Sequence, residues 1–326
     1  MRIVFAHHLS LRYLGGGEKW IVNTANELAK RGHDVEVYAL PFKLKGKYNN
    51  TLLELLQVPY HEGIRHSIDA DVTYMTYNPL SWLNYTVKGV KIAGIHSFAY
   101  WAKPNIRYGS LPLIACTANK FTSYFDLRRF DAAHTINRAF FPNHPCTYVI
   151  PNYVDSEKFR PYAKDKEFTV IYASRQIWQK GYETMQTIKK YFEWFGKVKF
   201  AGTVPEEEMP QFLSSGHVTI NPSIVDTFGL SIVESLMCET PVITSDILAH
   251  RKLELPLLYA NTVTEYLKNI KYIHQMIQNG SYPQYIRQCR KKSLKFDKRI
   301  IMDQLETMFK EVLDNNMLHA EKQGEF

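Results

Sequence analysis

Short runs rich in β-branched residues alternate with helical patterns from one end of the chain to the other. Such alternation is typical of α/β proteins with parallel sheets, because parallel strands need a crossover connection, usually a helix, between them. The extended runs cover residues 2–6, 34–40, 71–75, 90–95, 111–116, 133–136 and 147–150, and then 168–174, 198–202, 217–223, 241–245 and 256–260. The pattern predicts an α/β fold with parallel sheets.

A polar segment, "PNYVDSEKFRPYAKDKE" at 151–167, interrupts this pattern and is the best candidate for an interdomain hinge. It predicts an N-terminal domain over 1–150 and a C-terminal domain over 151–300. Residues 301–326 form a last helix and tail, whose apolar face is expected to pack back on the N-terminal domain. Open parallel sheets bind ligands at the carboxyl ends of their strands, so we expect the ligand between the two domains.

Composition narrows the class of protein. A net charge of +8 suits an anionic partner, and a loose basic cluster at 286–299 keeps a nucleic-acid-binding protein open as an alternative.

The N-terminus has no signal-peptide pattern, which predicts a cytoplasmic protein. The four cysteines are far apart, which argues against a zinc site. The sequence "DAD" at 69–71 precedes a predicted strand, so we interpret it as a turn and not as a metal-binding D-x-D motif.

The first helical pattern is preceded by the glycines Gly15, Gly16 and Gly17. A dinucleotide fingerprint needs a third glycine, but Trp20 stands at that position. It also needs an acid at the end of the second strand, which ends at Leu40 without one. A P-loop pattern is absent as well. Two interpretations remain open: a permissive turn, or amides at a helix N-terminus that receive an anion.

The second half supplies charged groups at the ends of its predicted strands. Arg175 and Lys180 follow one strand, and both could bind one anion, the first as a fork and the second as a point charge. Asp226 precedes a helix at whose start Phe228, Gly229 and Leu230 would present free amides to a phosphate. Glu234, inside that helix, is placed to accept hydrogen bonds from a diol.

Six segments in order resemble the retaining glycosyltransferases of family 4: "GGGEKWIVNTANELAKRGHDVEVYA", "GIHSF", "VIPNYVDSEKFRP", "SRQIWQKG", "FAGTVPEEEMPQFLSSGHVTINPS" and "DTFGLSIVESLMCETPVI". The resemblance implies the GT-B fold, two Rossmann-like domains with parallel sheets that face a central cleft. It implies a hexosyltransferase that uses a nucleoside-diphosphate sugar, UDP- or GDP-linked, as co-substrate, retains the anomeric configuration and needs no metal or other cofactor.

The same resemblance implies a role for each candidate residue. The family's paired acids fall on Asp226 and Glu234, with Glu234 on the ribose, and its diphosphate-binding cations fall on Arg175 and Lys180. Thr203 and Val204 would flank the base. The glycines Gly15 to Gly17 would close over the donor from the opposite domain, and His96 would face the donor or acceptor sugar. Arg175, Lys180, Asp226 and His96 are the predicted catalytic residues.

Departures from the family limit what is carried over. Asp226 replaces the usual glutamate, Glu239 replaces a glycine, and "DILAHRKLEL" lacks the usual glycine pair. The resemblance therefore does not identify the donor sugar. The acceptor stays open too: a lipid, a glycan, a protein or a small molecule. Aromatic residues between Tyr74 and Tyr108 are interpreted mainly as core, with peripheral membrane contact left open. A catalytically weak nucleotide-sugar-binding protein is the second alternative.

Overall fold

The computed structural model describes residues 1–13, 15–42, 48–96, 121–202 and 204–323. The predicted strand at 111–116 and the candidate Thr203 lie outside these residues. The chain forms two compact units: unit 1 comprises residues 1–136, 140–150 and 302–326, and unit 2 comprises residues 137–139 and 151–301. The predicted boundaries were 150/151 and 300/301. Each unit is built around its own parallel sheet, which confirms the predicted fold class.

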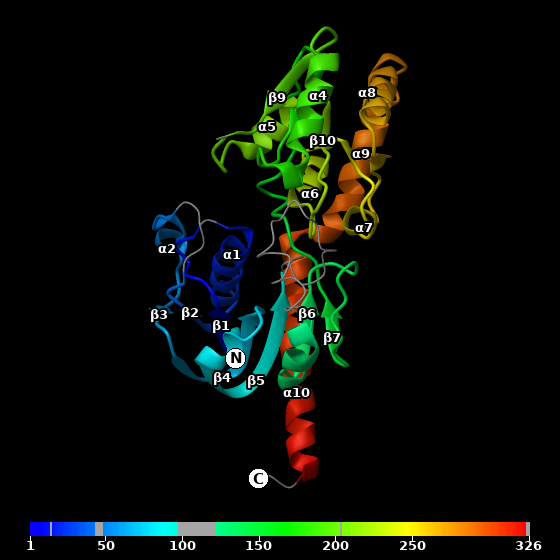
Figure 1. Cartoon of the computed structure of the whole chain (residues 1–326). Helices are drawn as coiled ribbons and strands as arrows, with labels where there is room; N and C mark the ends of the chain where they lie inside the picture. The colour runs from blue at the N-terminus through cyan, green and yellow to red at the C-terminus, as the bar shows by residue number, and fades with distance from the viewer. Residues whose placement is uncertain (14, 43–47, 97–120, 203, 324–326) are drawn as a thin grey trace. The chain divides into compact units, whose positions relative to one another are not determined.

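Unit 1 contains a seven-stranded sheet in the order β3-β2-β1-β4-β5-β6-β7 (Figure 1). All its neighbouring strands are parallel. Buried aliphatic and small side chains fill the central strands, as expected of a sheet that is covered on both faces. The strands are β1 (Arg2–His7), β2 (Asp34–Ala39), β3 (Tyr60–Glu62), β4 (His66–Thr76), β5 (Tyr85–Ile95), β6 (Ala132–Thr135) and β7 (Thr147–Val149).

The described helices of unit 1 connect these strands. The first, α1 (Gly16–Lys30), buries Trp20, Ile21 and Leu28, and the chain turns at Gly32 as predicted. The others include the α-helix α2 (Thr51–Leu55), the short 3₁₀ helices η1 (Ser81–Asn84) and η4 (Leu127–Arg129), and a helical segment at 121–126.

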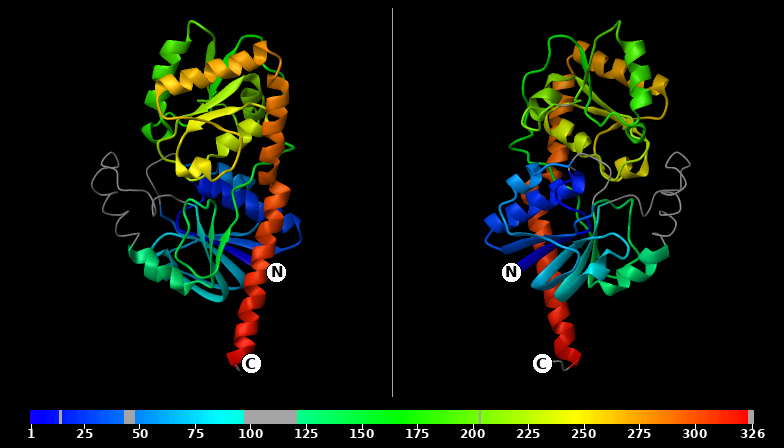
Figure 2. Two further views of the ribbon diagram at one scale, coloured as in Figure 1. Left: turned by 90° about the vertical axis from the view of Figure 1, so that its right-hand side faces the viewer. Right: turned by 60° about the vertical axis from the view of Figure 1, so that its left-hand side comes forward.

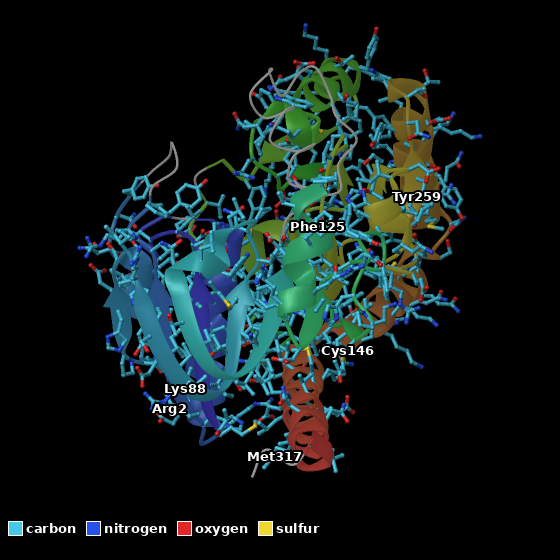
Figure 3. The ribbon with its side chains drawn as sticks, turned by 60° about the horizontal axis from the view of Figure 1, so that its bottom comes forward. Arg2, Lys88, Phe125, Cys146, Tyr259 and Met317 are labelled. Atoms are coloured by element: carbon cyan, nitrogen blue, oxygen red, sulfur yellow. The ribbon has the colours of Figure 1, made fainter. Side chains whose placement is uncertain are left out.

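The prediction of a turn at 69–71 is wrong. Strand β4 runs through these residues, and its register with β5 shifts between Asp69 and Val72, which marks an irregularity of the bulge type. Asp71 Oδ2 accepts the backbone N–H of Arg2 at 2.8 Å, and Asp69 lies 3.8 Å from Lys88 Nζ. Arg2 and Lys88 are labelled at the same end of the sheet in Figure 3. The two acids therefore form polar contacts with residues of the neighbouring strands β1 and β5.

Unit 2 contains a five-stranded parallel sheet in the order β12-β11-β10-β8-β9. Its strands are β8 (Thr169–Tyr172), β9 (Lys197–Phe200), β10 (Val218–Asn221), β11 (Val242–Ser245) and β12 (Leu258–Ala260); β9 begins one residue before its predicted run, and the others each lie inside a predicted run. Its described helices are η5 (Trp178–Lys180), α4 (Tyr182–Phe192), α5 (Met209–Ser215), α6 (Leu230–Met237), α7 (Leu248–Arg251), α8 (Val263–Gln278), α9 (Tyr282–Ser293) and η6 (Leu294–Phe296).

The last helix, α10 (Lys298–Gln323), begins in unit 2 and continues in unit 1. Its red C-terminal part runs alongside the strands of unit 1 in Figure 2. Glu306 lies 2.7 Å from Arg31 Nη1 and 2.6 Å from His33 Nε2, both just after α1. The apolar face predicted for this helix is buried: Ile301, Leu305, Met308, Phe309 and Val312.

Two further findings concern the described residues only. No helix among them is both long and apolar enough to cross a membrane. None of their His, Cys, Asp and Glu side chains gather in threes or more in a way that could hold a metal ion.

Candidate functional site

The strand order of unit 2 brings two sequence-distant loops together. Strand β8 has β9 on one side and β10 on the other, so the chain reverses its direction of progress across the sheet between β8 and β10. In open α/β sheets such a topological switch point leaves a crevice at the carboxyl ends of the two strands. The loop after β8 carries Arg175 and Lys180, and the loop after β10 carries Asp226 and Gly229. The candidate residues therefore sit where the fold favours ligand binding.

The loop after β8 is held in shape by backbone contacts. The buried hydroxyl of Tyr172 donates to the carbonyl of Arg175 at 2.9 Å and shares this bond with the carbonyl of Lys180 at 3.1 Å. Gly181 ends the loop with φ of +68°, and a Cβ there would clash with the carbonyl oxygen of Pro222. The Arg175 side chain is exposed, whereas Lys180 is partly buried. The loop thus presents its arginine to solvent and directs its lysine inward.

Gly181→Ala should lower the free energy of unfolding by about 2 to 4 kcal/mol, because the substitution adds a positive-φ penalty and a backbone clash. Chemical denaturation would measure the loss. Gly280→Ala is the matched control: Gly280 has φ of +77° but open space around it, so only the conformational penalty of about 1 kcal/mol applies. Equal losses in the two variants would contradict the packing argument.

The loop after β10 is joined to the first loop by its backbone. The carbonyl of Gln179 accepts the N–H groups of Ile224 at 2.9 Å and Val225 at 3.2 Å. Gly229, at φ of +84°, is the N-cap of α6. In the described part of the chain, the amides of residues 228–230 have no hydrogen-bond acceptor. Free amides at a helix start are donors that suit a phosphate oxygen.

Asp226 forms the electrostatic centre of this region. Its Oδ2 lies 2.8 Å from Lys180 Nζ and 3.5 Å from His250 Nε2, and its Oδ1 accepts the N–H of Thr227 at 2.8 Å. The Asp226 side chain is 7% exposed. Burial by itself would raise the pKa of this carboxyl, but the contacts with His250 and Lys180 outweigh burial and hold the pKa well below its ordinary range. Asp226 is therefore a carboxylate at neutral pH.

Sequence reasoning missed two residues that support this arrangement. His250 is fully buried, and its Nδ1 lies 3.2 Å from the Ser245 carbonyl oxygen and 2.7 Å from Thr244 Oγ1, while its Nε2 lies 3.5 Å from Asp226 Oδ2. Asn137 donates to the carbonyls of Thr227 at 3.0 Å and Ala249 at 2.9 Å. The departure from the family in "DILAHRKLEL" was the one signal for His250, and nothing in the sequence pointed to Asn137.

The remaining candidates of unit 2 lie on neighbouring elements. Glu234 is partly buried within α6, one helical turn after Leu230. Val204 follows β9 and is partly buried, and its N–H donates to the Ala201 carbonyl at 2.7 Å. Phe228 packs edge-on against Phe296 at 5.4 Å, so its side chain belongs to the core while its amide stays unpaired among the described residues.

The glycine loop of unit 1 lies at the corresponding switch point, between β1 and β4. A Cβ on Gly15 would clash with the carboxylate of Glu18, which is buried and lies 3.0 Å from His7 Nε2. Gly16 and Gly17 form the first turn of α1, and a Cβ on either would meet open space. Within unit 1, a side chain at position 15 would therefore displace the Glu18 carboxylate, whereas one at position 16 or 17 would meet no neighbour within 4 Å.

His96 directly follows β5 in unit 1. Its ring lies against the indole of Trp20, with centroids 4.3 Å apart, and its Nε2 lies 2.8 Å from the Tyr74 hydroxyl. Trp20 belongs to α1, so this helix links the glycine loop to His96.

Comparison with known proteins found a family model, curated sequences and solved structures that are similar to this chain. Residues 179–255, which contain Lys180, Asp226, Glu234 and His250, match the family model described as Glycosyl transferases group 1. The chain is 33% identical to the O-antigen chain mannosyltransferase B of Escherichia coli over 16% of this chain and 14% of that protein. It is 21% identical to one of the subunits of the human phosphatidylinositol N-acetylglucosaminyltransferase over 30% of this chain and 26% of that protein. The chain thus spans a minor part of these curated relatives.

Solved structures match over nearly the whole chain. Sucrose-phosphate synthase from Thermosynechococcus elongatus has a TM-score of 0.72 at 14% identity, with 97% of this chain and 100% of that chain covered. The Anabaena protein HepE, in complex with UDP and glucose, has a TM-score of 0.70 at 15% identity, with 95% and 99% covered. At such identities the likeness concerns the fold. The chain therefore has the GT-B fold, and its residues 179–255 match the model of the glycosyl transferases group 1.

Proposed function

We propose that this protein transfers a hexosyl group from a nucleoside-diphosphate sugar to an acceptor, with retention of the anomeric configuration and without a metal ion. The observation that carries the proposal is the joining of two loops at the switch point of unit 2. There Lys180 Nζ lies 2.8 Å from Asp226 Oδ2, and the amides of residues 228–230, unpaired among the described residues, follow Asp226 at the start of α6. The match at residues 179–255 and the complex of HepE with UDP and glucose support the donor class.

Each candidate site residue of unit 2 then has a role that the chemistry of its side chain or backbone permits. Arg175 and Lys180 would neutralise the diphosphate as it leaves, together with the amides of residues 228–230. Glu234 would accept hydrogen bonds from the ribose hydroxyls, and residues 203 and 204 would flank the base. Asp226 acts through Lys180, whose ammonium group it holds in place, and His250 in turn holds Asp226. Asp226 and His250 are thus positioning residues in this proposal.

The positive charges that the chain itself provides support the proposal of metal independence. Two cations and a helix N-terminus supply the field that a divalent metal supplies at many phosphate sites. Turnover should therefore be unchanged by EDTA, and activity that EDTA removes and Mg²⁺ restores would overturn this part of the proposal.

Ligand screening followed by a turnover assay tests the function. UDP, GDP or ADP at 100 times its dissociation constant should raise the stability by about 2.7 kcal/mol, which a thermal shift would detect. The matching sugar nucleotide should then release its nucleoside diphosphate, and NMR of the product would give its anomeric configuration. Stabilisation without release from any donor would favour a binding protein. Salt-dependent retention of DNA or RNA, with no stabilisation by nucleotides, would favour nucleic-acid binding.

Gly17→Leu should reduce turnover by about 10²-fold through misplacement of the donor, and should alter the affinity for the nucleoside diphosphate far less. The reason is that Gly17 has no packing role in its own unit, which leaves its small size available for close approach of a ligand. Steady-state kinetics and calorimetric titration would measure the two effects. Lys19→Leu, an exposed neighbour on the same helix, is the control. Unchanged turnover in Gly17→Leu would remove the glycine loop from the site.

A further inference from the structure

Three polar rings form a hydrogen-bonded chain at the carboxyl end of the unit 1 sheet. Tyr74 on β4, His96 after β5 and His134 on β6 come from three adjacent strands. The Tyr74 hydroxyl lies 2.8 Å from His96 Nε2 and 2.6 Å from His134 Nδ1, and His134 Nε2 lies 2.7 Å from the carbonyl oxygen of Ile150. Tyr74 and His134 are fully buried, whereas His96 is partly exposed.

We infer that this hydrogen-bonded chain of Tyr74, His96 and His134, the relay, fixes His96 as the Nε2–H tautomer. Nδ1 of His96 is then a hydrogen-bond acceptor for a sugar hydroxyl, and Tyr74 and His134 are positioning residues. The inference rests on the proposed glycosyl transfer for the identity of the ligand. The tautomer itself follows from the contacts within unit 1.

The direction of each hydrogen bond follows from the Ile150 carbonyl. A carbonyl oxygen can only accept, so Nε2 of His134 carries the proton of that bond. In a neutral imidazole the other nitrogen is then an acceptor, so Nδ1 of His134 accepts the single proton of the Tyr74 hydroxyl. The Tyr74 oxygen, having donated its proton, accepts from Nε2 of His96. The lone pair of His96 is therefore on Nδ1.

Both imidazoles are neutral, as this derivation requires. Burial lowers the pKa of His134 to about 4, and the hydrogen bond to Ile150 offsets only part of this effect. Burial also lowers the pKa of His96 well below its ordinary value, and the neighbouring His134, His7 and His8 lower it further. A neutral His96 has one donor and one acceptor, and the relay already uses the donor.

The packing around the relay leaves little freedom for these rings. Gly94 on β5 makes room for the Tyr74 hydroxyl, because a Cβ there would clash with it. Phe5 and Phe309 contact the ring of Tyr74, with centroids 5.6 and 6.1 Å away, and Trp20 covers the ring of His96. Within the described residues, no group forms a hydrogen bond to Nδ1 of His96.

A fixed, uncharged acceptor selects its ligand by chemistry. It binds a hydroxyl group, which can donate, and it repels a carboxylate or a phosphate oxygen, which can only accept when ionised. Sugars offer hydroxyls of this kind. The hydroxyl could belong to the sugar of the donor or to the acceptor, and the experiment below separates these two sources.

NMR of the ¹⁵N-labelled histidine side chains tests the tautomer without any ligand. The chain has 12 histidines, so the variants His96→Gln and His134→Gln would assign the two relevant ring systems. At pH 7 we expect Nε2 of both rings to be protonated and Nδ1 of both to be unprotonated. A protonated Nδ1 on His96, or a doubly protonated ring, would overturn the inference from the wild-type spectrum alone.

Tyr74→Phe tests the relay. Without the hydroxyl, the ¹⁵N signals of His96 should shift toward a mixture of the two tautomers, and unchanged signals would overturn the inference. Tyr77→Phe is the matched control, because Tyr77 is another buried tyrosine near the end of β4 whose hydroxyl contacts Asp126 at 3.4 Å, and its loss should leave both histidines unchanged. Gly94→Ala should disturb His96 as Tyr74→Phe does.

Kinetics identify the hydroxyl. Tyr74→Phe should lower kcat/KM about tenfold, the effect expected for one hydrogen bond that is weakened at its partner. Deoxy-sugar donors and deoxy acceptors each lack one hydroxyl group. For one of these compounds, Tyr74→Phe and the wild type should have the same kcat/KM, and the hydroxyl missing from that compound is the one that binds His96. If every compound showed the same loss, the assignment of a hydroxyl ligand would be wrong. Absence of turnover with all sugar nucleotides would refute the proposed function, while the NMR result would still decide the relay.

Discussion

Replacing Lys180 with methionine should lower the free energy of unfolding by about 3 kcal/mol at pH 7, because it leaves a buried carboxylate without its cation. The Lys180 and Asp226 side chains are 20% and 7% exposed, and their charged atoms lie 2.8 Å apart. Chemical denaturation would measure the loss. The variant should also lose affinity for a nucleoside diphosphate, since one of its two proposed diphosphate-binding cations is gone.

Two comparisons make this prediction specific. Lys189→Met removes the partly exposed ion-pair partner of Glu193, 3.3 Å away at the end of α4, and should cost no more than about 0.5 kcal/mol. The double variant Lys180→Met with Asp226→Asn should recover much of the lost stability, because no buried charge is left unpaired. If Lys180→Met were as mild as the surface control, Asp226 would not depend on Lys180.

The loss should also depend on pH with a defined sign. The pKa of Asp226 is depressed in the folded protein, so its contribution to stability is present above the pKa of the unfolded chain, about 4. That contribution is lost as the pH falls through the folded-state pKa. The difference between wild type and Lys180→Met should therefore shrink below about pH 4.

Replacing Arg175 with alanine should lower kcat by about 10²- to 10³-fold, by analogy with the loss of one donor that stabilises charge developing in a transition state. Its stability should change by less than about 0.5 kcal/mol, since the side chain is exposed and, among the described residues, has no hydrogen-bond or ion-pair partner. Donor turnover and chemical denaturation would give both values.

The control for Arg175 is Arg160, an exposed arginine of the same unit that lies near Tyr162. Arg160→Ala should leave kcat unchanged. If Arg175→Ala behaved in the same way, or if its loss of activity matched a loss of stability, the proposed contact with the diphosphate would be wrong. Together with Lys180→Met, this variant separates a cation that serves both fold and function from one that serves function alone.

Much of the architecture could be predicted from local patterns. The runs at 168–174, 217–223, 241–245 and 256–260 each contain a strand of unit 2, and the run at 198–202 overlaps β9, because alternating runs and helical periods report which residues are buried. Strand β3 was missed because it is short and largely exposed, "YHE" without an apolar pattern. The acids at 69–71 were misplaced because a bulge inside a long strand has the same composition as a turn.

The sequence by itself determined the α/β class, the strands of unit 2 and the residue types available for binding a diphosphate. Only the tertiary structure decided which of these residues meet. Strand order puts β8 beside β10 although β9 lies between them in sequence, and this brings Lys180 to Asp226, while β11 on the other side of β10 brings His250 to Asp226. The order β4, β5, β6 likewise joins Tyr74 to His134. Local patterns report burial and turns, whereas pairing between distant strands is set by how whole sheets pack, so such contacts leave no local trace in the chain.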